Sequence, residues 1–447
     1  MTTDGADYRR LLHGRQNSHQ APIDGADGFE DDNLAAPQSP PHNVGARPQR
    51  DLGSADWGVF GSMKIVLFKS KLNLLIPCGF LAILIDYTSQ NQGWVFPLSL
   101  LGIIPLAERL GFATEQLGLF TGRTAGGLLN ATFGNATELV ISIHALRSGK
   151  LRVVQQSLLG SILSNTLLVL GCAFFGGGLA CGKTEQAFRK EDAVLNSGLL
   201  LMAVMGLVSP AMLYYTHTEV NLGQSALALS RFSSCIMLVA YAAFIYFELS
   251  NSRRRDEASG DQGDDDYEYA YPEISKWEAI AWLGIFTAWI SVFSDFLVDA
   301  IEGASKAWKI PIAFISTVLL PIVGNAAEHA SAVMFAVKDK LDISLGVAIG
   351  SSTQISMFVI PFSVVTGWMM GQPMDLNFHL FETASLLITV LVVAFLLQDG
   401  TSNCFKGLML ILCYLIVAAS FYVYADPNID GKVSHLSKLF SVRQRRS

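Results

Sequence analysis

Two short stretches decide the fold of this 447-residue chain: Gly134-Asn135-Ala136-Thr137-Glu138 and Gly324-Asn325-Ala326-Ala327-Glu328. They lie 190 residues apart. Downstream, Gly160-Ser161-Ile162-Leu163-Ser164 is matched by Gly350-Ser351-Ser352-Thr353-Gln354, again 190 residues later, so the two copies stay in register over 26 positions. Chance seldom keeps two polar clusters in register within apolar segments. The chain therefore contains an internal repeat.

The composition predicts a membrane protein. The chain is 51% hydrophobic and only 15% charged, against about 25% charged residues in ordinary soluble domains. Between the charged regions run apolar stretches about as long as the roughly 20 residues that a helix needs to cross a bilayer. We expect eleven spans: Leu72–Tyr87, Trp94–Phe120, Thr124–Leu146, Val154–Gly178, Val194–Tyr214, Gly223–Phe247, Trp277–Ala300, Pro311–Val337, Leu341–Met370, Phe378–Leu397 and Cys404–Tyr424.

These spans predict an all-α polytopic membrane protein with one extra N-terminal helix (72–87) and two five-helix repeats (94–247 and 277–424). Because five is odd, the second repeat must insert upside down, and inverted repeats place a substrate site near the bilayer midplane. We expect residues 1–60 to be disordered and cytosolic, since they are too polar to bury a core. A charged, acidic cytosolic loop (248–276) joins the repeats, and a short tail (425–447) follows them. Lysine and arginine are enriched in the loops on the side of the N-terminus, which favours a cytosolic N-terminus.

The repeated residues have the chemistry of a cation site. On a helix, Asn135 and Glu138 share a face, as do Asn325 and Glu328, because each pair is three residues apart. Carboxylate, amide and hydroxyl oxygens are the ligands that hard cations such as Ca²⁺ prefer. Glycine before each asparagine permits close helix approach, and Pro321 removes a backbone donor in the second copy. The predicted ligands are Glu138, Glu328, Asn135, Asn325, Ser161, Ser164, Ser351 and Gln354.

A purely structural role for the two glutamates is the competing interpretation. An ionised group at the bilayer centre costs about 2.5–3.5 kcal/mol on insertion scales and usually faces a functional cavity. Neither motif helix offers a lysine or arginine at comparable depth, so we predict function for Glu138 and Glu328. The serines have a stronger structural alternative, because serine often only satisfies helix contacts in membranes.

Proton coupling follows from the same two carboxylates. Two carboxylates close together in a low dielectric cannot both stay ionised without a cation, and they titrate as one coupled unit. A divalent cation and protons therefore compete for Glu138 and Glu328. Competition of this kind, combined with alternating access, produces an antiporter.

The two glutamate motifs, together with Gly160-Ser161-Ile162-Leu163-Ser164-Asn165, resemble the paired signatures of the cation/proton exchangers (CAX) of the calcium/cation antiporter superfamily. The resemblance covers about residues 60 to 425 and is greatest to fungal vacuolar Ca²⁺/H⁺ exchangers. It implies a vacuolar membrane protein that exchanges Ca²⁺, or another divalent cation such as Mn²⁺, for protons. It also implies central roles for Glu138 and Glu328. We expect no enzymatic activity, no cofactor and no nucleic-acid partner; the ligands are Ca²⁺, protons and the lipid bilayer.

Further charged residues are candidates for the access path. Glu108 and Glu115 precede the first motif, with Arg109 as a possible neutralising partner, and Asp295, Asp299 and Glu302 precede the second. His329 adjoins Glu328 but points about 100° around the helix, so it lies at most on the flank of the site.

Three other functions fit the sequence less well. A Na⁺-driven Ca²⁺ exchanger of the same superfamily typically has proline beside each acid, where this chain has Thr137 and Ala327. A channel is disfavoured because a buried carboxylate pair binds too tightly for fast conduction. An intramembrane hydrolase would need an activated nucleophile or a metal triad, and the sequence shows neither.

Overall fold

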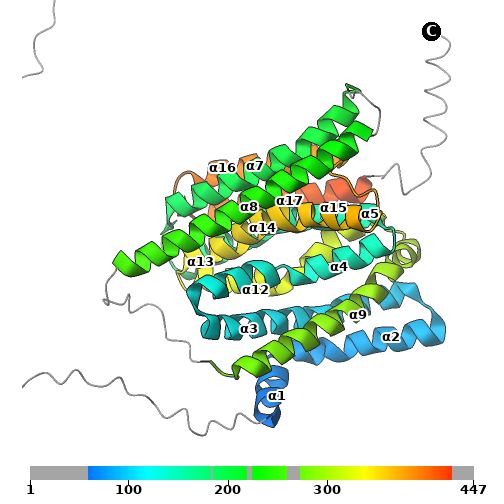
Figure 1. Ribbon diagram of the computed structural model, residues 1–447, viewed down its shortest axis with the longest axis horizontal. Coiled ribbons are helices and arrows are strands. Elements are labelled where there is room, and N and C mark those ends of the chain that lie inside the picture. Colours follow the sequence, from blue (N-terminus) through cyan, green and yellow to red (C-terminus); the bar gives the residue numbers. More distant parts are fainter. Residues whose placement is uncertain (1–58, 183–184, 219–223, 259–271, 425–447) are drawn as a thin grey trace, which may run out of the picture. The chain divides into compact units, whose positions relative to one another are not determined.

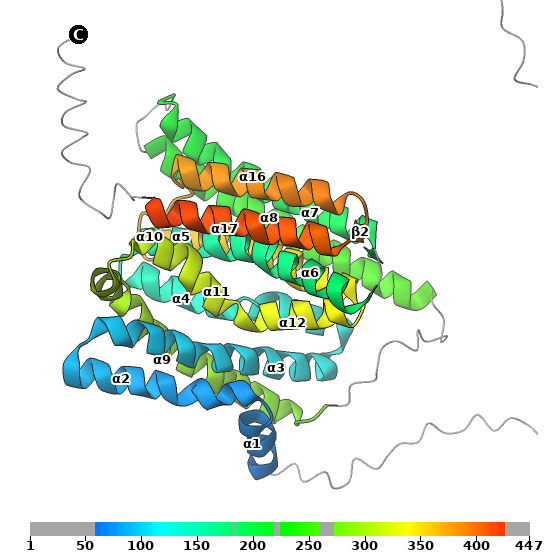
Figure 2. The same ribbon diagram turned by 180° about the vertical axis from the view of Figure 1, so that it is seen from behind.

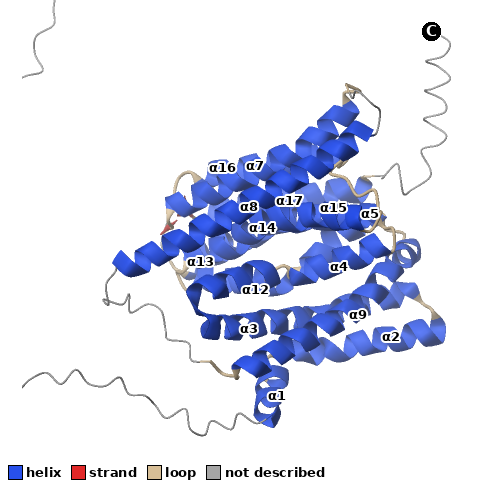
Figure 3. Cartoon of the chain, in the orientation of Figure 1, coloured by secondary structure: helices blue, strands red, loops and turns tan. Residues whose placement is uncertain are grey.

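The structure, a computed structural model, describes residues 59–182, 185–218, 224–258 and 272–424 (Figure 1). Residues 1–58 of the predicted disordered N-terminal region, residues 259–271 of the predicted acidic loop and the tail lie outside these residues. Residues 248–258, predicted as part of the loop, instead continue helix α8, and residues 59–60 begin helix α1. Within the described residues the chain is almost entirely helical (Figure 3), with one two-stranded antiparallel pairing of β1 with β2. The elements are α1 (Val59–Phe68), η1 (Lys71–Leu75), α2 (Ile76–Ser89), α3 (Gln92–Phe133), α4 (Ala136–Arg147), α5 (Leu151–Leu163), η2 (Ser164–Val169), α6 (Leu170–Ala180), β1 (Gln186–Ala187), α7 (Lys190–Tyr215), α8 (Gln224–Ala258), α9 (Lys276–Trp308), α10 (Ile312–Phe314), η3 (Ile315–Leu319), α11 (Leu320–Gly324), α12 (Ala326–Val337), α13 (Leu341–Leu345), η4 (Gly346–Gly350), α14 (Ser351–Gln354), η5 (Ile355–Val359), α15 (Ile360–Met369), α16 (Leu380–Leu397), β2 (Thr401–Ser402) and α17 (Cys404–Val423).

The chain is a polytopic membrane protein. Nine helices of the described residues are long and apolar enough to cross a bilayer, and a tenth candidate is the pair 312–324 and 326–337, which bends by 53° at its break. The remaining predicted span, Thr124–Leu146, covers the end of α3 and the whole of α4. It does not meet the criterion of length and apolar composition. Its place in the chain is nevertheless clear, because Gly118 and Gly126 lie in contact. Eight residues along a straight helix would separate them by about 12 Å, so the chain folds back between them.

The 190-residue register extends well beyond the two motifs. Helix α4 begins at Ala136 and α12 at Ala326, and both run for 12 residues. Helices α5 and α13 begin at Leu151 and Leu341, and α7 and α16 begin at Lys190 and Leu380. Equal spacing at each of these starts means that the two halves share one local architecture.

Helix packing is reciprocal between the halves. Helix α3 packs on its counterpart α9, and α7 packs on its counterpart α16. Helix α17 packs on α6, and, as the matching pair, α8 packs on α15. Figure 2 shows α17 lying alongside α6, with β2 at one end of these helices and α10 and α5 at the other. Exchange of equivalent partners is what two pseudo-symmetric repeats produce.

Local sequence accounts for the ends of the helices. Helix α9 starts with a capping box, in which the Ser275 side chain accepts from the Glu278 N–H and the Glu278 carboxylate accepts from the Ser275 N–H. This arrangement satisfies donors that a helix start leaves unpaired. The helix stops at Lys309, whose φ of 56° lies in the left-handed region, a common ending for a helix.

Candidate cation site

Each glutamate sits at the start of a half-helix. The helices break at Asn135 (φ −111°, ψ 26°) and at Asn325 (φ −91°, ψ 15°), and α4 and α12 restart at the next residue. Glu138 and Glu328 therefore lie in the first turn of their half-helices. The positive end of the helix dipole stabilises a negative charge there. Broken helices with ends of this kind are typical of substrate sites in transporters.

Both carboxylates line one cavity of about 380 Å³. The cavity is also lined by Asn135, Ser351 and Gln354 among the predicted ligands, and by Glu108, Arg109 and Glu115. Three of its lining residues, Asn130, Gly346 and Gln354, also line a neighbouring cavity that reaches Asp342, beside the 338–340 turn. It therefore leads from the end of the bundle that carries the 338–340 turn to the two glutamates.

Glu328 is held by donors from two different helices. Asn165 Nδ2 donates to Glu328 Oε2 at 3.1 Å, and Ser351 Oγ lies 3.1 Å from Glu328 Oε1. The Ser351 hydroxyl lies equally close to Asn135 Oδ1, at 3.0 Å. Since the hydroxyl has one proton, it can donate to only one of these oxygens at a time.

Amide side chains join the two halves of the molecule. Asn135 Nδ2 donates to Gln354 Oε1 at 2.6 Å, and Asn325 Nδ2 donates to Asn165 Oδ1 at 3.2 Å. Asn165 also donates to Ser351 Oγ at 3.1 Å. Residues 135, 325, 351 and 354, proposed from the sequence, thus meet in one network around Glu328.

Asn165 is the residue that reasoning from the repeat missed. It lies in the π-helical turn η2 and contacts Glu328, Ser351 and Asn325. Its counterpart 190 residues later is Ile355, so the repeat does not mark it. The signal that could have found it is a fully buried amide within an apolar span. The matching element in the other half, η5, is also a π-helical turn, and π-helical turns occur frequently at functional sites.

Glu138 faces two cavities. Besides the larger one, it lines a small cavity of about 20 Å³ together with Ser157, Ser161 and Asn325. Asn325 is 1% exposed, and its Oδ1 has no hydrogen-bond partner among the described residues. A buried amide oxygen without a donor needs an explanation, and a cation beside Glu138 would supply one.

Ser164 and His329 lie beside this network rather than in it. Ser164 Oγ is 3.5 Å from His329 Nε2, and His329 Nδ1 bonds the Asn325 carbonyl at 2.7 Å. Neither residue lines the two cavities described above. His329 is therefore placed on the flank, where the helical geometry puts it.

The access-path candidates divide into two groups. Glu108 and Glu115 line the larger cavity, and Arg109 Nε donates to Glu108 Oε2 at 3.0 Å. Arg109 thus pairs with Glu108 and leaves Glu115 exposed at the cavity wall. Asp295 instead contacts His144 at 3.1 Å, and Asp299 lies 3.5 Å from Lys150. These two aspartates and the exposed Glu302 line neither of the two cavities.

The donor set suits a hard cation more than a softer one such as Zn²⁺ or Cu⁺. Within the described residues no three His, Cys, Asp or Glu side chains gather closely enough to hold a metal. The two carboxylates are instead supplemented by amide and hydroxyl oxygens, which suit Ca²⁺. The six cysteines are free.

Comparison with known proteins agrees with this geometry. Residues 92–249 and 278–423 match the family described as sodium/calcium exchanger protein. The chain belongs to that family. It is 70% identical over 414 residues to the putative vacuolar cation/proton exchanger 4 of Oryza sativa subsp. japonica, covering 89% of this chain and 91% of the relative. It is 68% identical to the vacuolar cation/proton exchanger 5 of Arabidopsis thaliana, over 83% and 85% of the two chains.

A solved structure shows the same fold. The selenium-substituted Ca²⁺/H⁺ antiporter protein YfkE is 34% identical, with a TM-score of 0.65 over 79% of this chain and 99% of that one. Family membership and fold confirm the resemblance to cation/proton exchangers drawn from the two motifs. Similarity to the fungal exchangers in particular stays a prediction.

Proposed function

We propose that this chain is a secondary active antiporter that exchanges Ca²⁺ for protons, with Mn²⁺ as a second candidate cation. The observation that carries the proposal is that Glu138 and Glu328, one from each repeat, line the same cavity at the starts of two broken helices. Exchange of a cation for protons is what its relatives are named for, and Ca²⁺/H⁺ antiport is named for YfkE. The family is one of exchangers, so we propose no enzymatic activity.

Competition at the two carboxylates would couple the ions. When Ca²⁺ leaves, two negative charges in one water-poor cavity repel, and protons relieve the repulsion. When Ca²⁺ enters, it displaces those protons because ligand carboxylates must be deprotonated. The same oxygens therefore hold either Ca²⁺ or protons, and Asn135, Asn325 and Ser351 add neutral oxygens to the cation-bound state.

We propose that the larger cavity faces the cytosol. It leads to the end of the bundle with the 338–340 turn, which a cytosolic N-terminus puts on the cytosolic side. In the resulting orientation Ca²⁺ enters from the cytosol and is released into an acid lumen, where protonation of Glu138 and Glu328 promotes release. We place the protein in the vacuolar membrane, as its relatives are named vacuolar.

The deciding experiment identifies the driving ion. Purified protein is reconstituted into proteoliposomes with radioactive Ca²⁺ outside and buffer of chosen pH inside. We expect uptake when the interior is acid, loss of uptake when an ionophore dissipates the pH gradient, and unchanged uptake when Na⁺ is absent from both sides. Apparent Ca²⁺ affinity should weaken as the external pH falls, because protons compete for the same carboxylates.

Two controls tie the transport to the site. Glu138→Gln and Glu328→Gln each remove a ligand charge and a proton acceptor, so each should abolish exchange while the purified protein remains monodisperse. Uptake that follows an imposed Na⁺ gradient and ignores pH would favour a Na⁺-driven exchanger instead. Normal pH-driven uptake by either variant would contradict the two-carboxylate site.

A further inference from the structure

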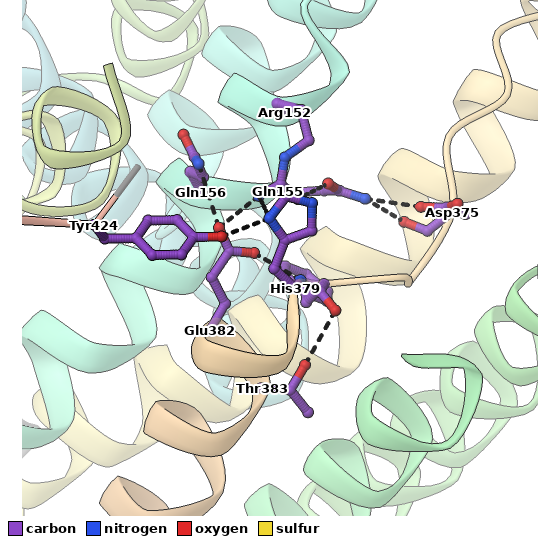
Figure 4. A network of polar contacts seen from close by, with 9 residues as sticks. Arg152, Gln155, Gln156, Asp375, His379, Glu382, Thr383 and Tyr424 are labelled. Atoms are coloured by element: carbon purple, nitrogen blue, oxygen red, sulfur yellow. Dashed lines mark hydrogen bonds and ion pairs between the residues drawn. The ribbon is translucent and has the colours of Figure 1, made fainter. Parts of the chain in front are cut away.

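A second cluster of titratable side chains joins the start of α5 to the start of α16 (Figure 4). Arg152 at the start of α5 contacts Glu382 at the start of α16, with 2.5 Å between Nη2 and Oε1. The Glu382 side chain is fully buried, and it also accepts from Gln156 Nε2 at 3.2 Å and from the His379 N–H at 3.0 Å. A buried carboxylate held by three donors is a rigid connection between the two halves.

His379 lies at the centre of this cluster, and its contact with Arg152 is one that a neutral ring makes. The Glu382 N–H donates to the His379 side chain in the capping box of α16. Arg152 Nη2 lies 3.3 Å from His379 Nδ1, and the Tyr424 hydroxyl lies 2.5 Å from it. Arginine has only donors, so Nδ1 must accept. A proton on Nδ1 would place an N–H against the Arg152 N–H and a positive charge beside the guanidinium.

The equivalent cluster at the other end of the bundle is exposed. The counterparts of His379, Glu382 and Arg152 in the other repeat are Arg189, Asp192 and Asp342, each 190 residues earlier or later. Arg189 pairs with Asp192 at 2.9 Å, with side chains 61% and 47% exposed, and all three residues line a cavity of about 300 Å³. One copy of the cluster is therefore buried and its symmetry mate is open.

Helix crossings show the same asymmetry. A Cβ on Gly160 would lie 2.1 Å from the Thr317 carbonyl oxygen, whereas a Cβ on its counterpart Gly350 would meet nothing within 4 Å among the described residues. The half of the molecule around Gly160 is thus tightly closed, and the half around Gly350 is open. The Arg152–Glu382 cluster lies at the closed end, where opening would require it to separate.

We propose that His379 is a second proton-binding site, separate from Glu138 and Glu328, and that a proton bound there releases the Arg152–Glu382 connection and allows the closed end to open. Histidine is the side chain that changes charge between about pH 5 and 8, and protonated histidines break interfaces in other pH-sensitive switches. Only the identity of the compartment, an acid lumen, rests on the proposed function. In that compartment, where protons are abundant, protonation of His379 would open the release pathway.

Among the described residues, charged and titratable groups from several elements surround the His379 ring. Arg152 is the cation on α5, Glu382 the carboxylate on α16, and the Tyr424 hydroxyl follows α17. From α7, Tyr215 bonds the backbone of Leu380. In the 371–379 loop, Asp375 accepts from Gln155 Nε2 at 2.8 Å, and burial raises the pKa of its carboxyl. Protonation of His379 adds positive charge near Arg152, and protonation of Asp375 removes negative charge there, so each weakens the contact of Arg152 with the His379 ring.

Thiol labelling tests the proposal without transport. Ser157 lines the small cavity beside Glu138 on the closed side, so Ser157→Cys in a background lacking the six native cysteines reports opening of that side. The protein is placed in nanodiscs and treated with a membrane-impermeant maleimide at about pH 7.5 and about pH 5.5, which bracket histidine titration. Ser89→Cys, an exposed position in the same background, corrects for the lower thiolate fraction in acid.

The corrected labelling rate of Ser157→Cys should rise about fivefold on acidification, a typical coupling between two sites. With His379→Gln added, which keeps an acceptor but binds no proton, the rise should be smaller than in the parent, because only Glu138, Glu328 and Asp375 would then respond to pH. His217→Asn, at an exposed position in the chain, should leave the pH response intact. An unchanged rate in the parent, or an equal rise with His379→Gln, would overturn the proposal. Because labelling needs no transported ion, failure of the Ca²⁺/H⁺ assignment would leave this result unaffected.

Discussion

At the scale of single residues, the repeat predicted the candidate site because polar side chains three apart on a helix share a face. That argument found Asn135, Glu138, Asn325 and Glu328, and the structure brings these four into the walls of the two cavities. It could not find Asn165, whose counterpart is apolar. The approximate symmetry therefore ends at the cation site itself, where Glu328 has two side-chain donors and Glu138 is bonded by none of the described side chains.

Replacing Asn165 tests this difference. Asn165→Ile installs the residue that the second repeat carries and removes the donor to Glu328 Oε2. Hydrogen bonds to charged groups contribute about 1.5–3 kcal/mol, so apparent Ca²⁺ affinity should fall by about ten- to a hundredfold in proteoliposome uptake. Thr166→Val is the matched control, because the Thr166 hydroxyl bonds only carbonyls of its own helix. Equal affinities for the two variants would show that Asn165 does not position Glu328.

Asp375 gives a prediction about stability and pH. Burial raises the pKa of its carboxyl, so ionisation costs stability in the folded protein as pH rises through that pKa. Asp375→Asn removes this cost and keeps an oxygen for Gln155 and for the Asn377 N–H. We expect a higher thermal unfolding midpoint than the parent at neutral pH, with the difference vanishing in acid, below the pKa of an unfolded aspartate. A lower midpoint at neutral pH would mean that the carboxylate charge is needed beside Arg152.

At the scale of elements, hydropathy predicted the long spans but not the breaks. The candidate spans of the structure match the predicted ones closely, because length and apolar composition decide them. Glycine and Pro321 indicated a loosened helix near each motif. The direction of the bend and the fold-back between Gly118 and Gly126 depend on packing between distant helices. The spacing of residues in the sequence does not predict that packing.

Glycines at equivalent positions should respond differently to one added methyl group. Gly160→Ala forces the Thr317 backbone to move and should lower the thermal stability, since overpacking typically costs about 1–3 kcal/mol. Gly350→Ala has open space and should be neutral or stabilising by about 1 kcal/mol, the usual gain of alanine over glycine in a helix. Both should slow transport, because alternating access requires each crossing to close in turn. A destabilising Gly350→Ala with full transport would refute the reciprocal closure.

At the scale of the whole molecule, the helix packing is reciprocal, while the Arg152–Glu382 cluster is buried and its counterpart is exposed. We interpret this as one of two conformations between which the protein alternates. Helix α17 packs on α6 as α8 packs on α15, so exchanging the roles of the halves would generate the opposite state. Such an exchange moves access from one face of the membrane to the other only if the halves are inverted. The orientation of equivalent turns is therefore the feature on which the mechanism depends.

Ser148 and Lys338 are counterparts 190 residues apart, and both are exposed in the turns that follow α4 and α12. Inverted repeats place these turns on opposite faces of the membrane, and a cytosolic N-terminus puts Lys338 in the cytosol. In intact vacuoles, an impermeant maleimide should label Lys338→Cys but label Ser148→Cys only after permeabilisation, both in a background without native cysteines. Labelling of both from one face would refute inversion and with it alternating access by exchange of the halves. Labelling of Ser148→Cys alone would keep the inversion, reverse the orientation, and place the larger cavity on the lumenal side.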